Sequence, residues 1–169
     1  GLIVLQQTRG VGFLDSTDNS TTWRRTVYRE GIELWTASPR NFTVGVGMDS
    51  IKRFSTDWHL FDDGRLPMGH FHSTPLQIAV ERGFPALLLW FAIVGIYLRD
   101  LWRFTADSPA VKGIVLGTFG GAIGFLVSGL VHYNLGDSEV AMVFFFLMGL
   151  SLALLDKNRQ NNLESRDSQ

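Results

Sequence analysis

Apolar residues are distributed unevenly along this chain of 169 residues. Three long apolar runs occupy its C-terminal half, at 84–98 (continued through Leu101 and Trp102), 111–133 and 140–155, whereas residues 6–83 are mostly polar. Each run approaches the roughly 20 residues that an α-helix needs to cross the hydrocarbon layer of a membrane. We therefore predict an all-α polytopic membrane protein, with three C-terminal transmembrane helices within 84–155 and a large, partly helical extracytoplasmic loop over 6–83.

The two ends of the chain differ from these regions. Residues 1–5 are apolar, the apolar run stops at Gln6, and neither an initiator Met nor a signal-peptide pattern precedes it. These five residues are therefore predicted to be the end of a truncated transmembrane helix from a longer protein. Residues 156–169 are predicted to form a polar cytoplasmic tail.

The orientation prediction comes from basic residues in the short connections between the apolar runs. Basic residues accumulate in the first connection and in the tail, at Arg99, Arg103, Lys112, Lys157, Arg159 and Arg166. Short loops rich in Lys and Arg stay on the cytoplasmic side, whereas long loops escape this rule. The turn at 134–139 has no basic residue, so it is predicted to lie outside, together with 6–83.

Charge and cysteine content exclude several classes of function. The formal net charge is −1, and the sequence contains no run of basic residues that would indicate a nucleic-acid partner. The chain has no cysteine, which excludes disulfides and thiolate metal sites.

Within the polar loop, residues 23–36 show a helical pattern. Thr22 is the predicted N-cap of this helix, and Pro39 follows its end. Its predicted apolar face consists of Val27, Ile32, Leu34 and Trp35.

Three arginines, Arg24, Arg25 and Arg29, lie on that predicted helix, and Arg25 and Arg29 are four residues apart. Like charges at this spacing repel each other, and Glu33 is placed to pair only with Arg29. Two interpretations stay open. The arginines form either a solvated helix face or a binding site for a phosphate or pyrophosphate. The second interpretation is possible because a planar guanidinium donates paired hydrogen bonds that suit a phosphate.

The strongest local signal is a short predicted helix that starts immediately after His72 and runs into the first apolar run. Ser73 or Thr74 is the predicted cap, Pro75 suits the first turn, and Gly83 is the predicted stop. The positive end of the helix dipole disfavours an imidazolium, so we expect His72 to be biased toward the neutral form that accepts a proton.

Several other features have alternative explanations. His70 and His72 form a His-x-His pair, but no third ligand is fixed, so we predict no metal site. The segment 45–47, Gly-Val-Gly, is interpreted as a tight backbone turn rather than a phosphate loop. Glycines at helical spacing over 113–129 predict close packing against another helix. His132, at the outer end of that run, is a candidate site residue or an interfacial histidine without a role.

Three features together resemble the O-antigen ligase and polymerase family of bacterial membrane glycosyltransferases. The first is a His, then Asn, Ser or Gln, nine residues and a Gly, which reads here as His72, Ser73, residues 74–82 and Gly83. The second is an arginine-bearing helix followed by Pro39 and the Gly-Val-Gly segment at 45–47. The third is the layout of a large periplasmic loop, a few C-terminal spans and a cytoplasmic tail. The distance from Pro39 to Gly45 departs from the family's shorter Pro-x-x-Gly.

The resemblance implies a bacterial inner-membrane enzyme that moves a glycan from a polyprenyl pyrophosphate carrier to an acceptor hydroxyl. The acceptor would be lipid A core sugar, a growing polysaccharide or a protein, and neither metal nor cofactor would be needed. It implies that His72 activates the acceptor and that Arg24 or Arg25 binds the pyrophosphate. Arg29 and His132 are further substrate-binding candidates because of their positions in the sequence. Membrane lipid is the remaining expected partner, and loop 6–83 would be periplasmic.

Alternative functions remain within and outside this class. A polymerase of repeat units, a lipopolysaccharide ligase and a protein O-glycosylating ligase share the same layout. A transporter-like or non-catalytic membrane protein is the alternative outside enzymes. A transporter places ionisable groups inside its spans, and the interiors of the three apolar runs contain none.

Overall fold

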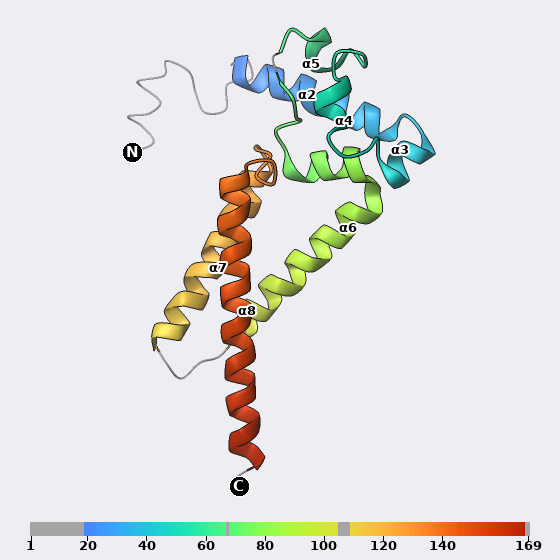
Figure 1. Cartoon of the computed structure of the whole chain (residues 1–169). Coiled ribbons are helices and arrows are strands. Elements are labelled where there is room, and N and C mark those ends of the chain that lie inside the picture. The colour runs from blue at the N-terminus through green and yellow to red at the C-terminus, as the bar shows by residue number, and fades with distance from the viewer. Residues whose placement is uncertain (1–18, 67, 105–108, 168–169) are drawn as a thin grey trace, which may run out of the picture. The chain divides into compact units, whose positions relative to one another are not determined.

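The computed structural model describes residues 19–66, 68–104 and 109–167, and every regular element in these ranges is an α-helix (Figure 1). The predicted all-α class is therefore confirmed. The described chain forms two units, one made of 19–72 and 76–84, the other of 73–75 and 85–167. The predicted membrane segment at 1–5 lies outside the described residues.

The first unit contains four helices and the start of a fifth. These are α2 (Asn19–Thr36), α3 (Pro39–Val44), α4 (Ser50–Phe54), α5 (Leu60–Asp63) and the first part of α6 (Thr74–Arg103). Apolar side chains from all but α3 form its buried core, which comprises Val27, Ile51, Leu60, Phe61, Phe71 and Val80. The polar loop thus has a hydrophobic core of its own.

Helix α2 corrects two predictions. It begins at Asn19, so Thr22 lies inside the helix and is not its cap. Ile32 is 51% exposed, whereas Val27 is fully buried. The buried side of α2 follows Trp23, Val27 and Leu34, at steps of four and seven residues, and Ile32 falls outside that stripe.

Helix α6 is interrupted at Gly83, where φ is 81° and ψ is 174°. Helical structure resumes at once, and Pro85 stands in the first turn of the new segment, where a missing N–H costs no hydrogen bond. The predicted stop at Gly83 is therefore confirmed as a break between two helical segments.

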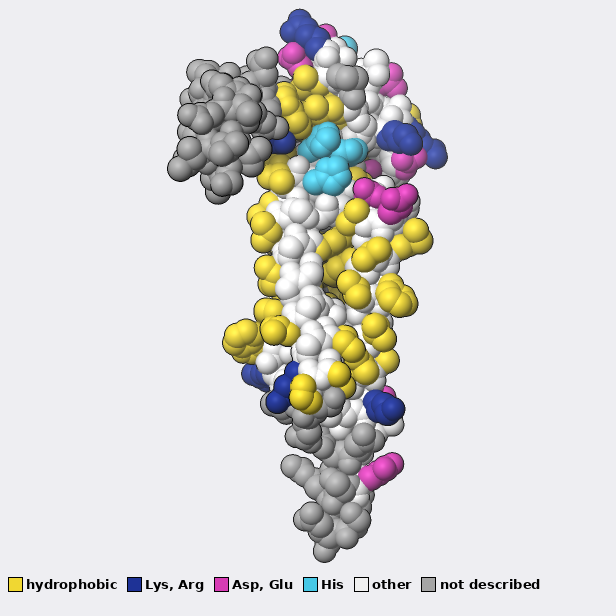
Figure 2. All heavy atoms as spheres, turned by 90° about the vertical axis from the view of Figure 1, so that its left-hand side faces the viewer, with side chains coloured by type: hydrophobic (Ala, Val, Ile, Leu, Met, Phe, Trp, Pro, Cys, Tyr) yellow, Lys and Arg dark blue, Asp and Glu magenta, His cyan; other side chains and the backbone are white. Residues whose placement is uncertain are grey.

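The second unit contains the remainder of α6, α7 (Pro109–Gly129) and α8 (Ser138–Asp167). Three helices of the described chain are long and apolar enough to cross a membrane: Thr74–Arg103, Pro109–Gly129 and Ser138–Gln160. Many hydrophobic side chains on them are exposed, including Leu116 at 71% and Phe146 at 68%, and Figure 2 shows such side chains on one face. The predicted three C-terminal spans are confirmed.

The bounds of the last two helices differ from the predictions. Helix α7 ends at Gly129, four residues before the predicted end at Tyr133, and α8 continues through the predicted tail to Asp167. The early end of α7 has a local cause. The buried side-chain amide of Asn134 donates to the carbonyl oxygen of Phe125 (2.7 Å) and to the hydroxyl of Ser128 (2.6 Å), which turns the chain back onto the last helical turn.

The predicted close packing at the α7 glycines is not found within the described chain. Apart from the adjacent residues and the nearby backbone of α7 itself, no described atom lies within 4 Å of a Cβ placed on the five glycines at 113, 117, 120, 121 and 124. Only at Gly129 does a side chain approach, with Thr74 Oγ1 at 3.3 Å.

Candidate functional site

His72 occupies an unusual backbone conformation immediately before α6. Its φ is 50°, in the left-handed region that residues other than glycine rarely adopt. A histidine held there needs support from its surroundings, because the conformation costs about 1 kcal/mol or more.

Hydrogen bonds from side chains supply that support on both sides of His72. The Tyr28 hydroxyl donates to the carbonyl oxygen of His72 (3.1 Å), and the His72 N–H donates to His70 Nδ1 (3.2 Å). One residue earlier, the N–H of Phe71 donates to Gln77 Oε1 (3.0 Å). Three different side chains therefore hold the backbone of Phe71 and His72.

Trp23 brings the first of the three arginines and His72 to one aromatic ring. The rings of Trp23 and His72 meet edge to face, with centroids 5.1 Å apart and planes at 70°. The guanidinium carbon of Arg24 lies 4.8 Å from the Trp23 ring centroid, within the range of a cation–π interaction. We call Trp23, Arg24, Tyr28, His70 and His72 the His72 site.

A further ring contact and the shifted pKa of Tyr28 complete the description of this site. The imidazole rings of His70 and His72 have centroids 4.1 Å apart. Burial raises the pKa of the Tyr28 phenol above its usual value of 10.0, and the charge of Arg24 partly offsets this increase. Tyr28 therefore stays a neutral donor at physiological pH, and its phenol senses the guanidinium of Arg24.

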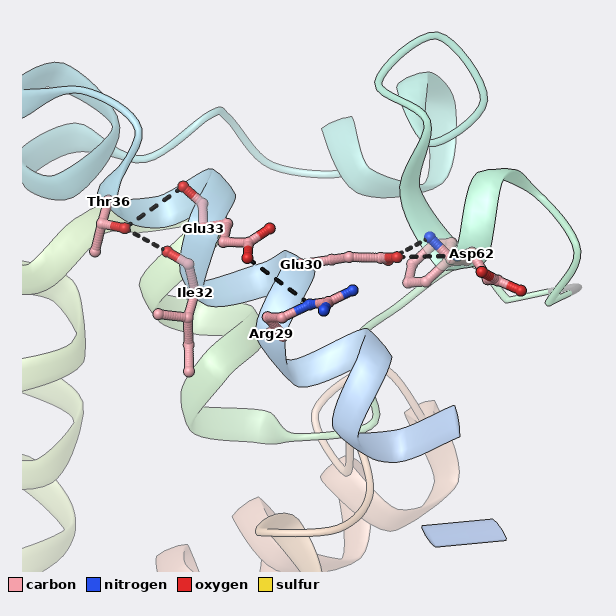
Figure 3. Close-up of polar contacts among 7 residues, drawn as sticks. Arg29, Glu30, Ile32, Glu33, Thr36 and Asp62 are labelled. Carbon is pink, nitrogen blue, oxygen red and sulfur yellow. Dashed lines mark hydrogen bonds and ion pairs between the residues drawn. The ribbon is translucent and has the colours of Figure 1, made fainter. Parts of the chain in front are cut away.

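Arg25 and Arg29 are placed differently from Arg24, because both are exposed whereas Arg24 is half-buried. Arg29 Nε lies 3.7 Å from Glu33 Oε1, and the two side chains are 69% and 67% exposed (Figure 3). The predicted Arg29–Glu33 pair is confirmed. An exposed pair of this kind contributes little to stability.

Glu30, also on α2, fixes the next part of the first unit. Its carboxylate accepts hydrogen bonds from the backbone N–H groups of Phe61 and of Asp62 (3.0 Å to the latter; Figure 3). Phe61 and Asp62 have φ values of 62° and 57°, so the carboxylate stabilises a left-handed turn. Phe61 is buried there and packs on Phe71, the residue before His72, with ring centroids 5.6 Å apart.

The Gly-Val-Gly segment at 45–47 is a tight backbone turn, as predicted, and it closes the first segment of α6. The N–H groups of Val46 and Gly47 donate to the carbonyl oxygens of Val80 (2.8 Å) and Glu81 (3.0 Å). A Cβ on Gly45 would collide with the backbone of Glu81, and a Cβ on Gly83 with that of Thr43. Gly45 and Gly83 thus allow the backbone of this turn to approach the backbone at the end of the first α6 segment closely.

His132 belongs to the second unit, in the turn after α7, and its side chain is exposed. Its carbonyl oxygen accepts a hydrogen bond from Thr74 Oγ1 (3.1 Å), which also accepts the N–H of Asn134 (3.0 Å). Thr74 is the first residue of α6, and its hydroxyl bonds this turn. The structure therefore places Arg24 with His72, leaves Arg25 and Arg29 on the exposed side of α2, and gives His132 a backbone contact to Thr74.

Sequence reasoning missed Trp23, Tyr28 and Gln77 as parts of this arrangement. Tyr28 follows Arg24 by four residues, so their shared helix face was a usable signal. Trp23 carried no such signal, because its partner His72 is distant in sequence. Gln77 lies only six residues after Phe71, but no spacing rule pairs its side chain with that backbone N–H. Among the described residues, no group of three or more His, Asp or Glu side chains is arranged to hold a metal ion.

A comparison with protein-family models identifies one match, to the O-antigen ligase family, over residues 2–91. The matched range contains the entire first unit, the His72 site and the start of the first span. No curated protein and no solved structure matches the chain significantly. Since the match covers more than half of the chain and includes its helical loop and the break at Gly83, this membrane protein belongs to the O-antigen ligase family.

Proposed function

We propose that the chain is part of an enzyme that transfers a glycan from a polyprenyl pyrophosphate to an acceptor hydroxyl. The observation that carries this proposal is the arrangement around Trp23, which contacts both the guanidinium of Arg24 and the imidazole of His72. A cation and a candidate base on one aromatic ring match the two needs of the reaction, which are to stabilise a charged leaving group and to activate a weak nucleophile. Membership in the O-antigen ligase family supports the same activity class.

In the proposed reaction, the acceptor oxygen attacks the anomeric carbon and the bond from that carbon to the pyrophosphate oxygen breaks. His72 accepts the acceptor's proton through an imidazole nitrogen, as a general base. The pyrophosphate leaves with the polyprenyl carrier and keeps the bonding electron pair. Attack in line with the leaving group inverts the anomeric configuration.

Arg24 would bind the pyrophosphate and offset the charge that develops as it leaves. Its guanidinium carbon lies 4.8 Å from the centroid of the Trp23 ring, and a planar guanidinium suits the bidentate recognition of a phosphate group. Arg25 and Arg29 on the first unit and His132 on the second would be secondary binding residues, each with a small effect of its own, because exposed charged side chains contribute little individually. This mechanism requires neither a metal ion nor a cofactor.

The proposed location is the bacterial inner membrane, with the first unit on the periplasmic side. Basic residues near the cytoplasmic ends of the spans support this orientation. The acceptor would be lipid A core sugar, a polysaccharide or a protein, so ligase and polymerase activities both fit the site. A transporter-like role is less well supported, because the interiors of the three apolar runs contain no Asp, Glu, Lys or Arg.

The test is complementation of ligase-deficient and polymerase-deficient strains by the full-length protein and its variants, with the lipopolysaccharide ladder as readout. We expect the parent to restore the ladder in one strain and His72→Ala to lower transfer by about 100-fold or more, the usual effect of losing a general base. The responding strain distinguishes ligase from polymerase. Normal transfer by an inserted His72→Ala protein would refute the role of His72.

A further inference from the structure

We infer that Gln77 and Glu81 are positioning residues for His72, an inference that rests on the proposed function. Both side chains lie on the first segment of α6, one helical turn apart, and both are buried, at 2% and 5% exposed. Neither contacts the His72 side chain in any described hydrogen bond. Their effect passes through the backbone of Phe71.

The Gln77 amide has a fixed orientation. The N–H of Phe71 can only donate, so the Gln77 atom 3.0 Å from it is the amide oxygen, and the Gln77 NH₂ group points the other way. Burial raises the pKa of the Glu81 carboxyl, one helical turn along, and hydrogen bonds from the Gln77 side chain and the Asp49 backbone partly offset this increase. The Gln77 NH₂ group is therefore the donor to Glu81.

Phe71 directly precedes His72 and belongs to the same turn. The N–H of Phe71 begins the turn in which His72 adopts its φ of 50°. Phe71 is itself fully buried, so an unpaired N–H there would be costly. Glu81, Gln77 and the Phe71 backbone thus form a directional chain of hydrogen bonds that ends one residue before the imidazole.

Polar side chains that only stabilise a helix can be donors or acceptors in any order. The series of hydrogen bonds from Glu81 through Gln77 to Phe71 requires that one of the two side chains is an amide and the other a carboxylate. Exchanging the two types keeps every role. A Glu at 77 accepts from Phe71, a Gln at 81 donates to that Glu, and its oxygen still accepts the N–H of Asp49.

The experiment compares Gln77→Glu, the exchange variant Gln77→Glu with Glu81→Gln, and Gln77→Met in the full-length protein. Gln77→Glu sets two carboxyl groups against each other and removes the orienting donor, so we expect kcat to fall about tenfold with little change in KM for the donor. The exchange variant should recover most of the loss. Gln160→Glu makes the same change at an exposed residue and is the control.

A second readout does not depend on transfer activity. The rate at which diethyl pyrocarbonate modifies His72 is measured by mass spectrometry, with His132 as the internal reference. We expect His72 to react about threefold faster in Gln77→Met, which removes the acceptor of the Phe71 N–H, and in Gln77→Glu, where repulsion from Glu81 displaces that acceptor. In the exchange variant His72 should react at the parental rate. His132 should be unchanged.

These readouts separate the two proposals. If His72→Ala keeps its activity while the reactivity of His72 still follows the exchange pattern, the proposed function fails and the positioning role stands. If His72→Ala is inactive but Gln77→Glu has parental kcat and parental His72 reactivity, the positioning role is wrong. Failure of the exchange variant to recover either readout also overturns it. If Gln77→Glu does not insert, Gln77→Met takes its place in both comparisons.

Discussion

The hydroxyl of Tyr28 donates a hydrogen bond to the backbone carbonyl oxygen of His72, across 44 positions of sequence. This bond ties the arginine-bearing helix α2 to the turn that presents the imidazole. Because Tyr28 also lies near Arg24, one phenol connects the two groups to which the proposed reaction assigns chemistry.

Removal of that hydroxyl should therefore affect both stability and turnover. We expect Tyr28→Phe to lower the free energy of unfolding of the first unit by about 1 kcal/mol and to lower transfer about fivefold. Tyr133→Phe removes the same atom in the second unit and is the control. Unchanged transfer in Tyr28→Phe would mean that the bond does not position His72.

The effect of Tyr28→Phe should also be independent of pH over the usual working range. Burial raises the pKa of the folded Tyr28 phenol above 10.0, so the stability it contributes is complete below the unfolded value and is lost only as pH rises through the folded value. The ratio of parental to variant activity, measured between about pH 6 and 9, should thus be constant. A ratio that changes within this range would assign the titration to another group.

Arg24 and Arg25 should differ sharply although they are neighbours in sequence. Arg24→Ala is expected to weaken donor binding about tenfold or more, because a charged, half-buried hydrogen-bond donor is lost. Arg25→Ala removes an exposed side chain and should change binding less than about twofold. Binding of a polyprenyl pyrophosphate to the purified full-length variants checks this. Equal losses in both variants would contradict the assignment to Arg24.

Arg24→Lys sharpens the same test. Lysine keeps the charge but lacks the planar pair of donors, so we expect it to recover only part of the affinity. Full recovery would indicate that charge alone matters at this position.

Gly83→Ala should be far more damaging than Gly64→Ala, although both glycines have positive φ values of 81° and 77°. At Gly64 a Cβ meets nothing within 4 Å, so only the backbone cost of about 1 kcal/mol applies. At Gly83 it would also collide with the Thr43 carbonyl, and we expect a loss of at least about 3 kcal/mol. Thermal unfolding in detergent measures both. Similar midpoints for the two variants would show that the backbones do not approach as described.

Glu30 and Glu33 provide a matched pair on one helix (Figure 3). Glu30→Ala leaves the N–H groups of Phe61 and Asp62 without their charged acceptor and should destabilise the first unit by about 2 kcal/mol. Glu33→Ala breaks an exposed ion pair and should cost less than about 0.5 kcal/mol. Faster proteolysis near 61–62 in Glu30→Ala, with Glu33→Ala unaffected, is the expected pattern. Equal protection in both would argue against the role of Glu30.

The contacts that sequence reasoning predicted are local ones. The break at Gly83 and the Arg29–Glu33 pair depend on residues within one or two helical turns, and the three spans depend on composition. The missed features depend on irregular turns or on segments that are distant in sequence. Asn134 shortens α7 through a turn that hydropathy cannot detect, and Glu30 acts on a left-handed turn 31 residues away.

The candidate site shows the same division. His72 and the arginine group were recognisable as motifs, but the choice among the arginines depended on Trp23, which packs on His72 only after the loop folds. Glu81 and Gln77 lie inside the motif spacing at positions that the motif leaves unspecified. The role of this amide and this carboxylate can be recognised only in the structure, where the Phe71 N–H lies beside Gln77.

The joint between the Gly45–Gly47 turn and the end of the first α6 segment has a practical consequence for engineering. The carbonyl groups of Val80 and Glu81 are satisfied by amides from a segment that precedes His72 in the chain. If residues 72–83 were transplanted alone, the carbonyl groups at the end of this helical segment would lack their hydrogen-bond donors. Portability to another scaffold requires residues 43–47 as well, in a matching register, so the smallest transferable module is discontinuous in sequence.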